Sequence, residues 1–84
     1  MVKLNEEQIK RLYNVFDFEE NEEIVSATIE SEKGGVMEIN YIDNSNGVVG
    51  CYKPYFQKHG KEDLEKLDII LNGVPNVPKV ERVE

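Results

Sequence analysis

Apolar residues follow two different periods along this chain, and the changes of period mark its predicted elements. In residues 4–16 they recur at helical spacing, as Ile9, Leu12, Tyr13 and Phe16. Asn5 stands at the N-cap position with Gln8 three residues on, which is the pattern of a capping box. This pattern predicts an amphipathic helix that begins at about Glu6 and buries its apolar stripe in the core.

The next part of the chain alternates apolar and polar residues, which is typical of half-buried strands. Two runs place apolar side chains at every second position, Val25, Ala27 and Ile29 in the first and Met37, Ile39 and Tyr41 in the second. A third run, VVGCY, follows Asn46-Gly47, a pair that suits the positive φ angles of a tight hairpin turn. We expect an antiparallel three-stranded meander, with the helix stripe packed on Val25, Ala27 and Ile29.

A second helix is predicted over residues 61–73, where Leu64, Leu67, Ile70 and Leu71 share one face and Gly73 can cap the C-terminus. Two prolines in residues 74–84 predict an extended tail, docked along a sheet edge or on a second subunit. The predicted class is therefore α+β in the order α-β-β-β-α, with both helices on one sheet face. Residues 1–73 form the predicted domain.

This order of elements resembles that of a double-stranded RNA-binding domain, in which lysines at the start of the second helix contact phosphates. The resemblance would give that role to Lys58 and Lys61. Acidic residues follow these lysines directly, and the first hairpin turn, EKGG, lacks the family's Gly-Pro-x-His loop. The resemblance therefore concerns topology only.

Charge restricts the kind of partner. The 84 residues include seventeen acids and ten bases, for a formal net charge of −7. Nucleic acids and anionic membranes repel such a chain, so we expect no direct binding to either and a protein partner with a basic surface. The small core that 84 residues can form makes a homodimer plausible. A single cysteine and an N-terminus without a signal-peptide pattern indicate a cytoplasmic protein.

Catalytic and metal chemistry find little support in the sequence. Cys51 and His59 are single residues of their types, too few for a zinc site or an assured nucleophile–base arrangement. We expect Cys51 to be a small buried side chain in the third strand. The calcium-like stretch DNSNG has Gly47 one position early and Pro54 at its twelfth position. The chain is predicted to be non-enzymatic, without metal or cofactor.

Two segments remain as candidate binding sites. The first is a turn in which five of seven residues are acidic, namely Asp17, Glu19, Glu20, Glu22 and Glu23. These acids could contact a basic protein, or imitate phosphates and occupy a nucleic-acid-binding groove. In size and charge, the chain resembles the small acidic inhibitors and accessory factors of phages and other mobile elements.

The second candidate segment, residues 51–61, carries three lysines and no acid. It is either a plain surface loop, a patch that meets an acidic surface, or a site for a phosphorylated or nucleotide ligand. In the last case the helix N-terminus would favour an anion. The ligand-binding residues would be Lys53, Tyr55, Lys58, His59 and Lys61.

Overall fold

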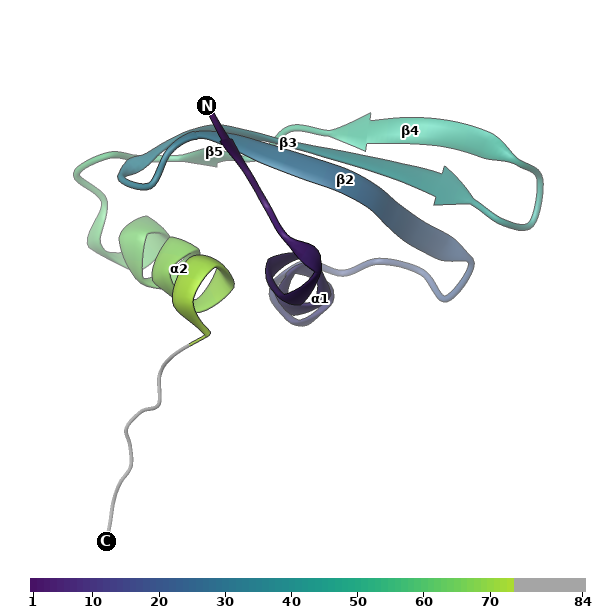
Figure 1. Cartoon of the computed structure of the whole chain (residues 1–84), viewed down its shortest axis with the longest axis horizontal. Helices are drawn as coiled ribbons and strands as arrows, with labels where there is room; N and C mark the ends of the chain where they lie inside the picture. Colours follow the sequence, from purple (N-terminus) through teal and green to yellow (C-terminus); the bar gives the residue numbers. More distant parts are fainter. Residues whose placement is uncertain (74–84) are drawn as a thin grey trace, which may run out of the picture.

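The computed structural model of the chain describes residues 1–73, and the tail predicted over residues 74–84 lies outside them. The elements are β1 (Val2–Lys3), α1 (Glu6–Val15), β2 (Glu22–Ser31), β3 (Gly34–Asp43), β4 (Val48–Tyr52), β5 (Tyr55–Phe56) and α2 (Lys61–Asn72). Figure 1 shows both helices under the same face of one twisted sheet. The α+β class, the central meander and the placement of the helices are confirmed, and two short strands are added to the predicted order.

Helix α1 begins where the capping pattern placed it. The Gln8 backbone N–H donates to Asn5 Oδ1 over 2.9 Å, and the Asn5 N–H donates to Gln8 Oε1 over 2.8 Å. Leu12 is fully buried. Tyr13 lies at the border of the stripe, 40% exposed, and its hydroxyl oxygen accepts the Ile24 N–H over 2.6 Å. The helix therefore covers the sheet and also satisfies a backbone donor of β2.

A β-bulge in β2 overturns one face assignment. Ile24 pairs with Tyr41 and Ser26 with Asn40, so Val25 is an extra residue without a partner on β3. Val25 is 63% exposed, whereas Ile24 is buried. The prediction that Val25 faces α1 was wrong, because a period of two assumes unbroken strand pairing and one extra residue exchanges the two faces.

The two hairpins of the meander use glycine differently. Gly34 pairs with Ser31 and has a φ of 122°, and a Cβ added there would lie 2.8 Å from the Phe56 carbonyl oxygen. The second connection spans residues 44–47, in which only Gly47 has a positive φ, of 75°. The predicted tight turn at Asn46-Gly47 is thus a longer loop.

The core lies between the sheet and the two helices. The sheet order is β1-β2-β3-β4, and β5 pairs with β3 beyond the end of β4. No polar or charged residue is buried among residues 1–73. The buried apolar residues are Leu4, Leu12, Ile24, Ala27, Ile29, Met37, Ile39, Phe56, Leu67 and Ile70.

Helix α2 is held against α1 at its C-terminal end. Gln8 Nε2 donates to the Leu71 carbonyl oxygen over 3.0 Å, and Arg11 Nη1 donates to the Ile70 carbonyl oxygen over 3.2 Å. These contacts satisfy carbonyls that a helix end leaves unpaired. Gly73 adds the predicted left-handed C-cap, with a φ of 74°.

Strand β4 exposes its cysteine. Cys51 pairs with Asn40 on the helix-free face of the sheet and is exposed. Our expectation of a buried Cys51 was therefore wrong, because no helix packs on that face. Within residues 1–73, neither helix is long and apolar enough to cross a membrane.

Candidate functional site

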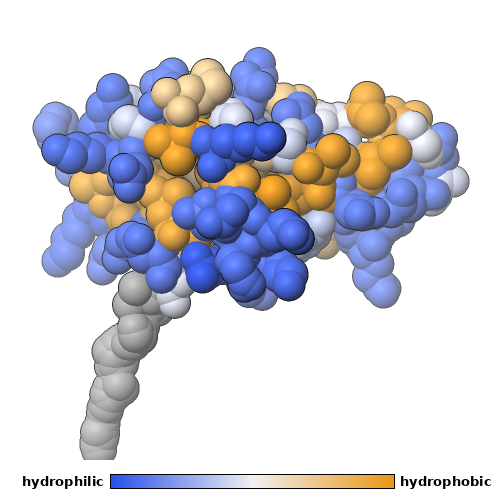
Figure 2. Space-filling view, in the orientation of Figure 1, coloured by the Kyte–Doolittle hydropathy of each residue, from blue (hydrophilic) through white to orange (hydrophobic). Residues whose placement is uncertain are grey.

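The acidic turn and the β3–β4 hairpin meet at one end of the molecule. Figure 1 shows the hairpin extending past both helices, with the loop that follows α1 returning beneath it. We call this part, residues 17–23 and 40–52, the distal end. Figure 2 shows apolar residues gathered over the upper right of the molecule, where β4 lies. Acidic and exposed apolar surface therefore occur together here.

The five predicted acids lie at the distal end but not in one row. Glu22 pairs with Asp43 and Glu23 with Ile42, so these consecutive strand residues point to opposite faces of the sheet. Glu22 accepts the Glu19 N–H over 2.8 Å, and Glu23 accepts Asn44 Nδ2 over 3.1 Å. Glu22 thus lies on the helix-covered side of the sheet, and Glu23 lies on the helix-free side.

A sixth acid, Asp43, also lies at the distal end. The sequence did not lead us to predict it as a site residue. Its carboxylate accepts the Ser45 hydroxyl over 2.6 Å, Asn21 Nδ2 over 2.6 Å and the Ser45 N–H over 2.9 Å. The Ser45 hydroxyl, followed by Asn21 and the Ser45 N–H, lowers the pKa of Asp43 below its ordinary value of 3.8. The sequence signal was Asp-x-Ser at a strand end, where Asp bonds to the backbone two residues on.

Beside these acids lies a groove of about 470 Å³, which we call the aromatic hollow. Phe18 makes an edge contact with Tyr41 at a centroid distance of 5.7 Å, and Phe16 makes one with Tyr52 at 5.4 Å. Asp17 and Glu22 belong to its lining. The full lining is Val15, Phe16, Asp17, Phe18, Glu22, Tyr41, Cys51 and Tyr52.

Gly50 shapes the hollow from within β4. It pairs with Tyr41, and a Cβ added at Gly50 would lie 2.6 Å from Tyr41 Cζ. The glycine therefore leaves room for the tyrosine ring on the helix-covered face. Sequence reasoning missed the hollow because its aromatic residues come from the end of α1, the acidic turn and two strands, and only the strand register brings Tyr41 beside Gly50.

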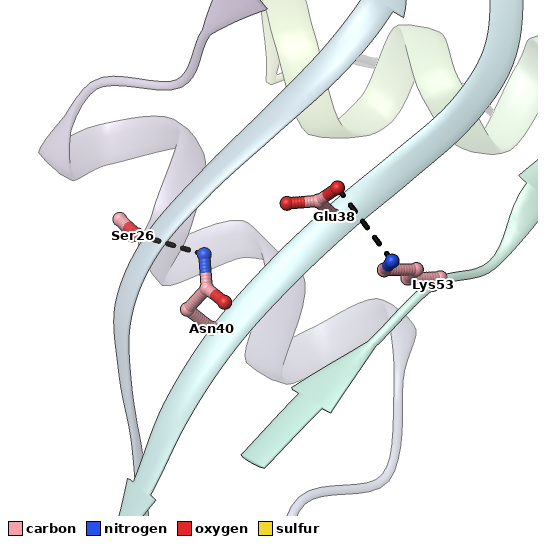
Figure 3. A network of polar contacts seen from close by, with 4 residues as sticks. All are labelled: Ser26, Glu38, Asn40 and Lys53. Carbon is pink, nitrogen blue, oxygen red and sulfur yellow. Dashed lines mark hydrogen bonds and ion pairs between the residues drawn. The ribbon is translucent and has the colours of Figure 1, made fainter. Parts of the chain in front are cut away.

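The basic segment is divided between two surfaces. Lys53 forms an ion pair with Glu38 at 3.8 Å, close to the hydrogen bond from Asn40 to Ser26 (Figure 3). Tyr55, which is 60% exposed, pairs with Val36 on the same helix-free face. Both residues are thus on the opposite side of the sheet from the helices.

The other three residues of this segment lie near α2. Lys58 and Lys61 line a groove of about 550 Å³ together with Lys33 of the β2–β3 turn, and His59 is exposed in the neighbouring turn. Three carboxylates, those of Glu32, Glu65 and Asp68, line the same groove. The structure therefore does not gather the five predicted ligand residues into one site.

The N-terminus of α2 also has its own carboxylates. Gly60 provides no side-chain cap, and Asp63 Oδ2 accepts the Gln57 N–H over 2.8 Å. Glu62 and Asp63 stand in the first turn, where an incoming anion would approach. Their charge opposes binding of a phosphate at this position.

Residues 1–73 contain no cluster of three or more His, Cys, Asp or Glu side chains that could hold a metal ion. Comparison with known proteins found no match: no family model, no curated protein and no solved structure is significantly similar to this chain. The function is therefore argued from the chain's own geometry.

Proposed function

We propose that this chain is a non-enzymatic binding protein that engages a basic segment of another protein through the aromatic hollow and the acids beside it. The supporting observation is that Asp17 and Glu22 line the same groove as Phe16, Phe18 and Tyr52. Carboxylates alone would be an ordinary solvated surface. Carboxylates next to aromatic rings form an environment suited to an arginine or lysine side chain.

Two kinds of interaction would stabilise such a contact. A cation over an aromatic face gains about 0.5–2 kcal/mol, depending on how far it is desolvated. A guanidinium that also meets a carboxylate forms a charge-assisted hydrogen bond, which is stronger than a neutral one. The net charge of −7 attracts a basic partner at long range and speeds the encounter. The hollow would then supply the short-range contacts.

A finer form of this proposal names the partner class. The basic surface would be one that ordinarily binds nucleic acid, with the acids in place of phosphates, as in an inhibitor or accessory factor of phage type acting in the cytoplasm. Because Glu22 and Glu23 face opposite ways, such a mimic would use Asp17, Glu19 and Glu20 with only one of those two. Competition between nucleic acid and this chain for a captured partner would test this form.

The proposal is tested with an arginine-rich peptide as the probe. Binding is measured by calorimetry for the wild type and for Asp17→Asn combined with Glu22→Gln. We expect a loss of about tenfold in affinity, equivalent to about 1.4 kcal/mol. Glu62→Gln with Glu65→Gln is the matched control, since it removes the same charge from α2.

Equal losses in the two double variants would contradict the proposal, because they would show attraction by net charge alone. The aromatic contribution is tested separately with Tyr52→Ala, since Tyr52 is 45% exposed. Its affinity for the peptide should fall even at high salt, where charge attraction between exposed groups is screened.

A ligand-binding function is the second candidate, supported by the three lysines that line the groove beside α2. If a nucleotide or phosphate binds there, it should raise the melting temperature of the wild type. Replacing Lys58 and Lys61 with glutamine should abolish that shift and leave the fold intact, because exposed substitutions usually change stability by no more than about 0.5 kcal/mol. A flat wild-type response across a nucleotide panel would remove this candidate.

A further inference from the structure

Within residues 1–73, strand β4 is a free edge of the sheet and carries no charge. It is last in the order β1-β2-β3-β4, and its pairing with β3 uses only one side of the strand. Residues 44–52 are nine consecutive uncharged residues in a chain that is 32% charged. Val49 is 72% exposed and Val48 59% exposed. An uncharged, apolar edge with unpaired backbone groups is a template for a further strand.

The opposite edge of the sheet, at β1 and β2, is protected against pairing with a further strand. Strand β1 covers β2 at Thr28 and Ile29. Farther along β2, the Ile24 N–H donates to the Tyr13 hydroxyl, and the bulge at Val25 interrupts the regular edge. Bulges and covering segments are the usual means by which proteins block unwanted strand pairing. No such feature shields β4 within residues 1–73.

We infer that β4 pairs with β4 of a second copy of this chain, antiparallel and about a two-fold axis at Gly50. In this register Val48 lies opposite the partner's Tyr52, and Val49 lies opposite the partner's Cys51. The interface is the same patch on both copies, as two-fold symmetry requires. The two sheets become continuous, and both helix layers lie on the same side. This inference does not depend on the proposed binding of a basic partner.

Charge placement favours this antiparallel arrangement. Lys53 directly follows β4 at one end, on the helix-free face where it pairs with Glu38, and Glu23 lies on the same face at the other end, two strands in from β4. Antiparallel pairing brings the cationic end of each strand to the acidic end of its partner. The uncharged strand between them adds no repulsion at the seam, although each chain has a net charge of −7. The arrangement therefore adds a long-range attraction between Lys53 and the partner's Glu23 and no like-charge contact at the seam.

The test measures molecular mass by sedimentation equilibrium under reducing conditions over a concentration series. The wild type should approach twice the 9.7 kDa mass of one chain. Val49→Lys should stay at the mass of one chain, because a lysine on an edge strand blocks pairing. Val25→Lys, the same change at another exposed valine, should still form the dimer. A monomeric wild type, a dimeric Val49→Lys or loss of the dimer in both variants would overturn the inference.

Disulfide formation tests the register of the paired strands independently of the mass measurement. Val49→Cys places a second cysteine opposite the partner's Cys51, where opposed Cα atoms lie about 4.5–5.5 Å apart, within the range for a disulfide. Mild oxidation should give covalent dimers. Val48→Cys carries the same number of cysteines, but residue 48 faces the other side of the sheet from Cys51, so it should give few. Equal cross-linking of both variants would overturn the proposed pairing.

Discussion

The helix-covered part of the sheet and the distal end differ in how their strands are used. Under the helices, β2 and β3 bury Ala27, Ile29, Met37 and Ile39 almost completely. At the distal end, the same β3 continues into a hairpin whose valines Val48 and Val49 are largely exposed. A single long strand therefore lies in the core at one end and leads into an exposed hairpin at the other.

Element lengths explain the difference. Strands β2 and β3 have ten residues each, so each is about 33 Å long at ~3.3 Å per residue. The two helices lie side by side along the length of the sheet (Figure 1), and at about 10 Å in diameter they cover about 20 Å. The end of the hairpin therefore extends past the helices. Surface that packing does not use is available for binding.

The largest expected effect contrasts one residue from each region. Leu12→Ala should lower the free energy of unfolding by about 2–5 kcal/mol, because Leu12 is fully buried and the surrounding core is small. Val49→Ala should change it by no more than about 0.5 kcal/mol in a monomer. Denaturant melts at low protein concentration measure both. A loss under about 1 kcal/mol for Leu12→Ala would mean that α1 is not part of the core.

Two glycines with positive φ give an intermediate effect. In Gly34→Ala, the strain of the positive φ alone should destabilise the protein by about 1–3 kcal/mol. The total loss should be larger, because the added Cβ would also lie against the Phe56 carbonyl oxygen. Gly47→Ala meets no atom within 4 Å and should cost only about 1–2 kcal/mol, from its left-handed backbone. Thermal melts should rank the two in this order. The reverse order would mean that the β5 contact with the first hairpin is loose.

The smallest effect is the pH dependence contributed by Asp43. Hydrogen bonds lower its pKa in the folded state, so its contribution to stability is complete above the ordinary value of 3.8 and is lost as the pH falls through the lower folded value. The stability difference between the wild type and Asp43→Asn should therefore shrink on acidification below pH 3.8. Urea melts from pH 7 to pH 2 measure it. A difference that stays constant over this range would show that the hydrogen bonds do not favour the charged form.

Local sequence signals determined most of the fold. The capping box and apolar stripe fixed the start and buried face of α1, and the leucine spacing with Gly73 did the same for α2. Alternation and turn residues predicted the meander. These features could be predicted because each depends on residues a few positions apart, whose interactions form within one helix, strand or turn. The acidic character of the distal end was also evident from the sequence.

Tertiary structure decided the features that depend on register and on layer size. The bulge that exposes Val25, the position of Cys51 on the helix-free face and the pairing of β5 with β3 all depend on how distant strands align. The aromatic hollow joins Phe18 to Tyr41 for the same reason. Periodicity states which residues share a face of a strand. It does not state where pairing slips by one residue, nor how far along the sheet two helices reach, because both are settled by the packing of the whole chain.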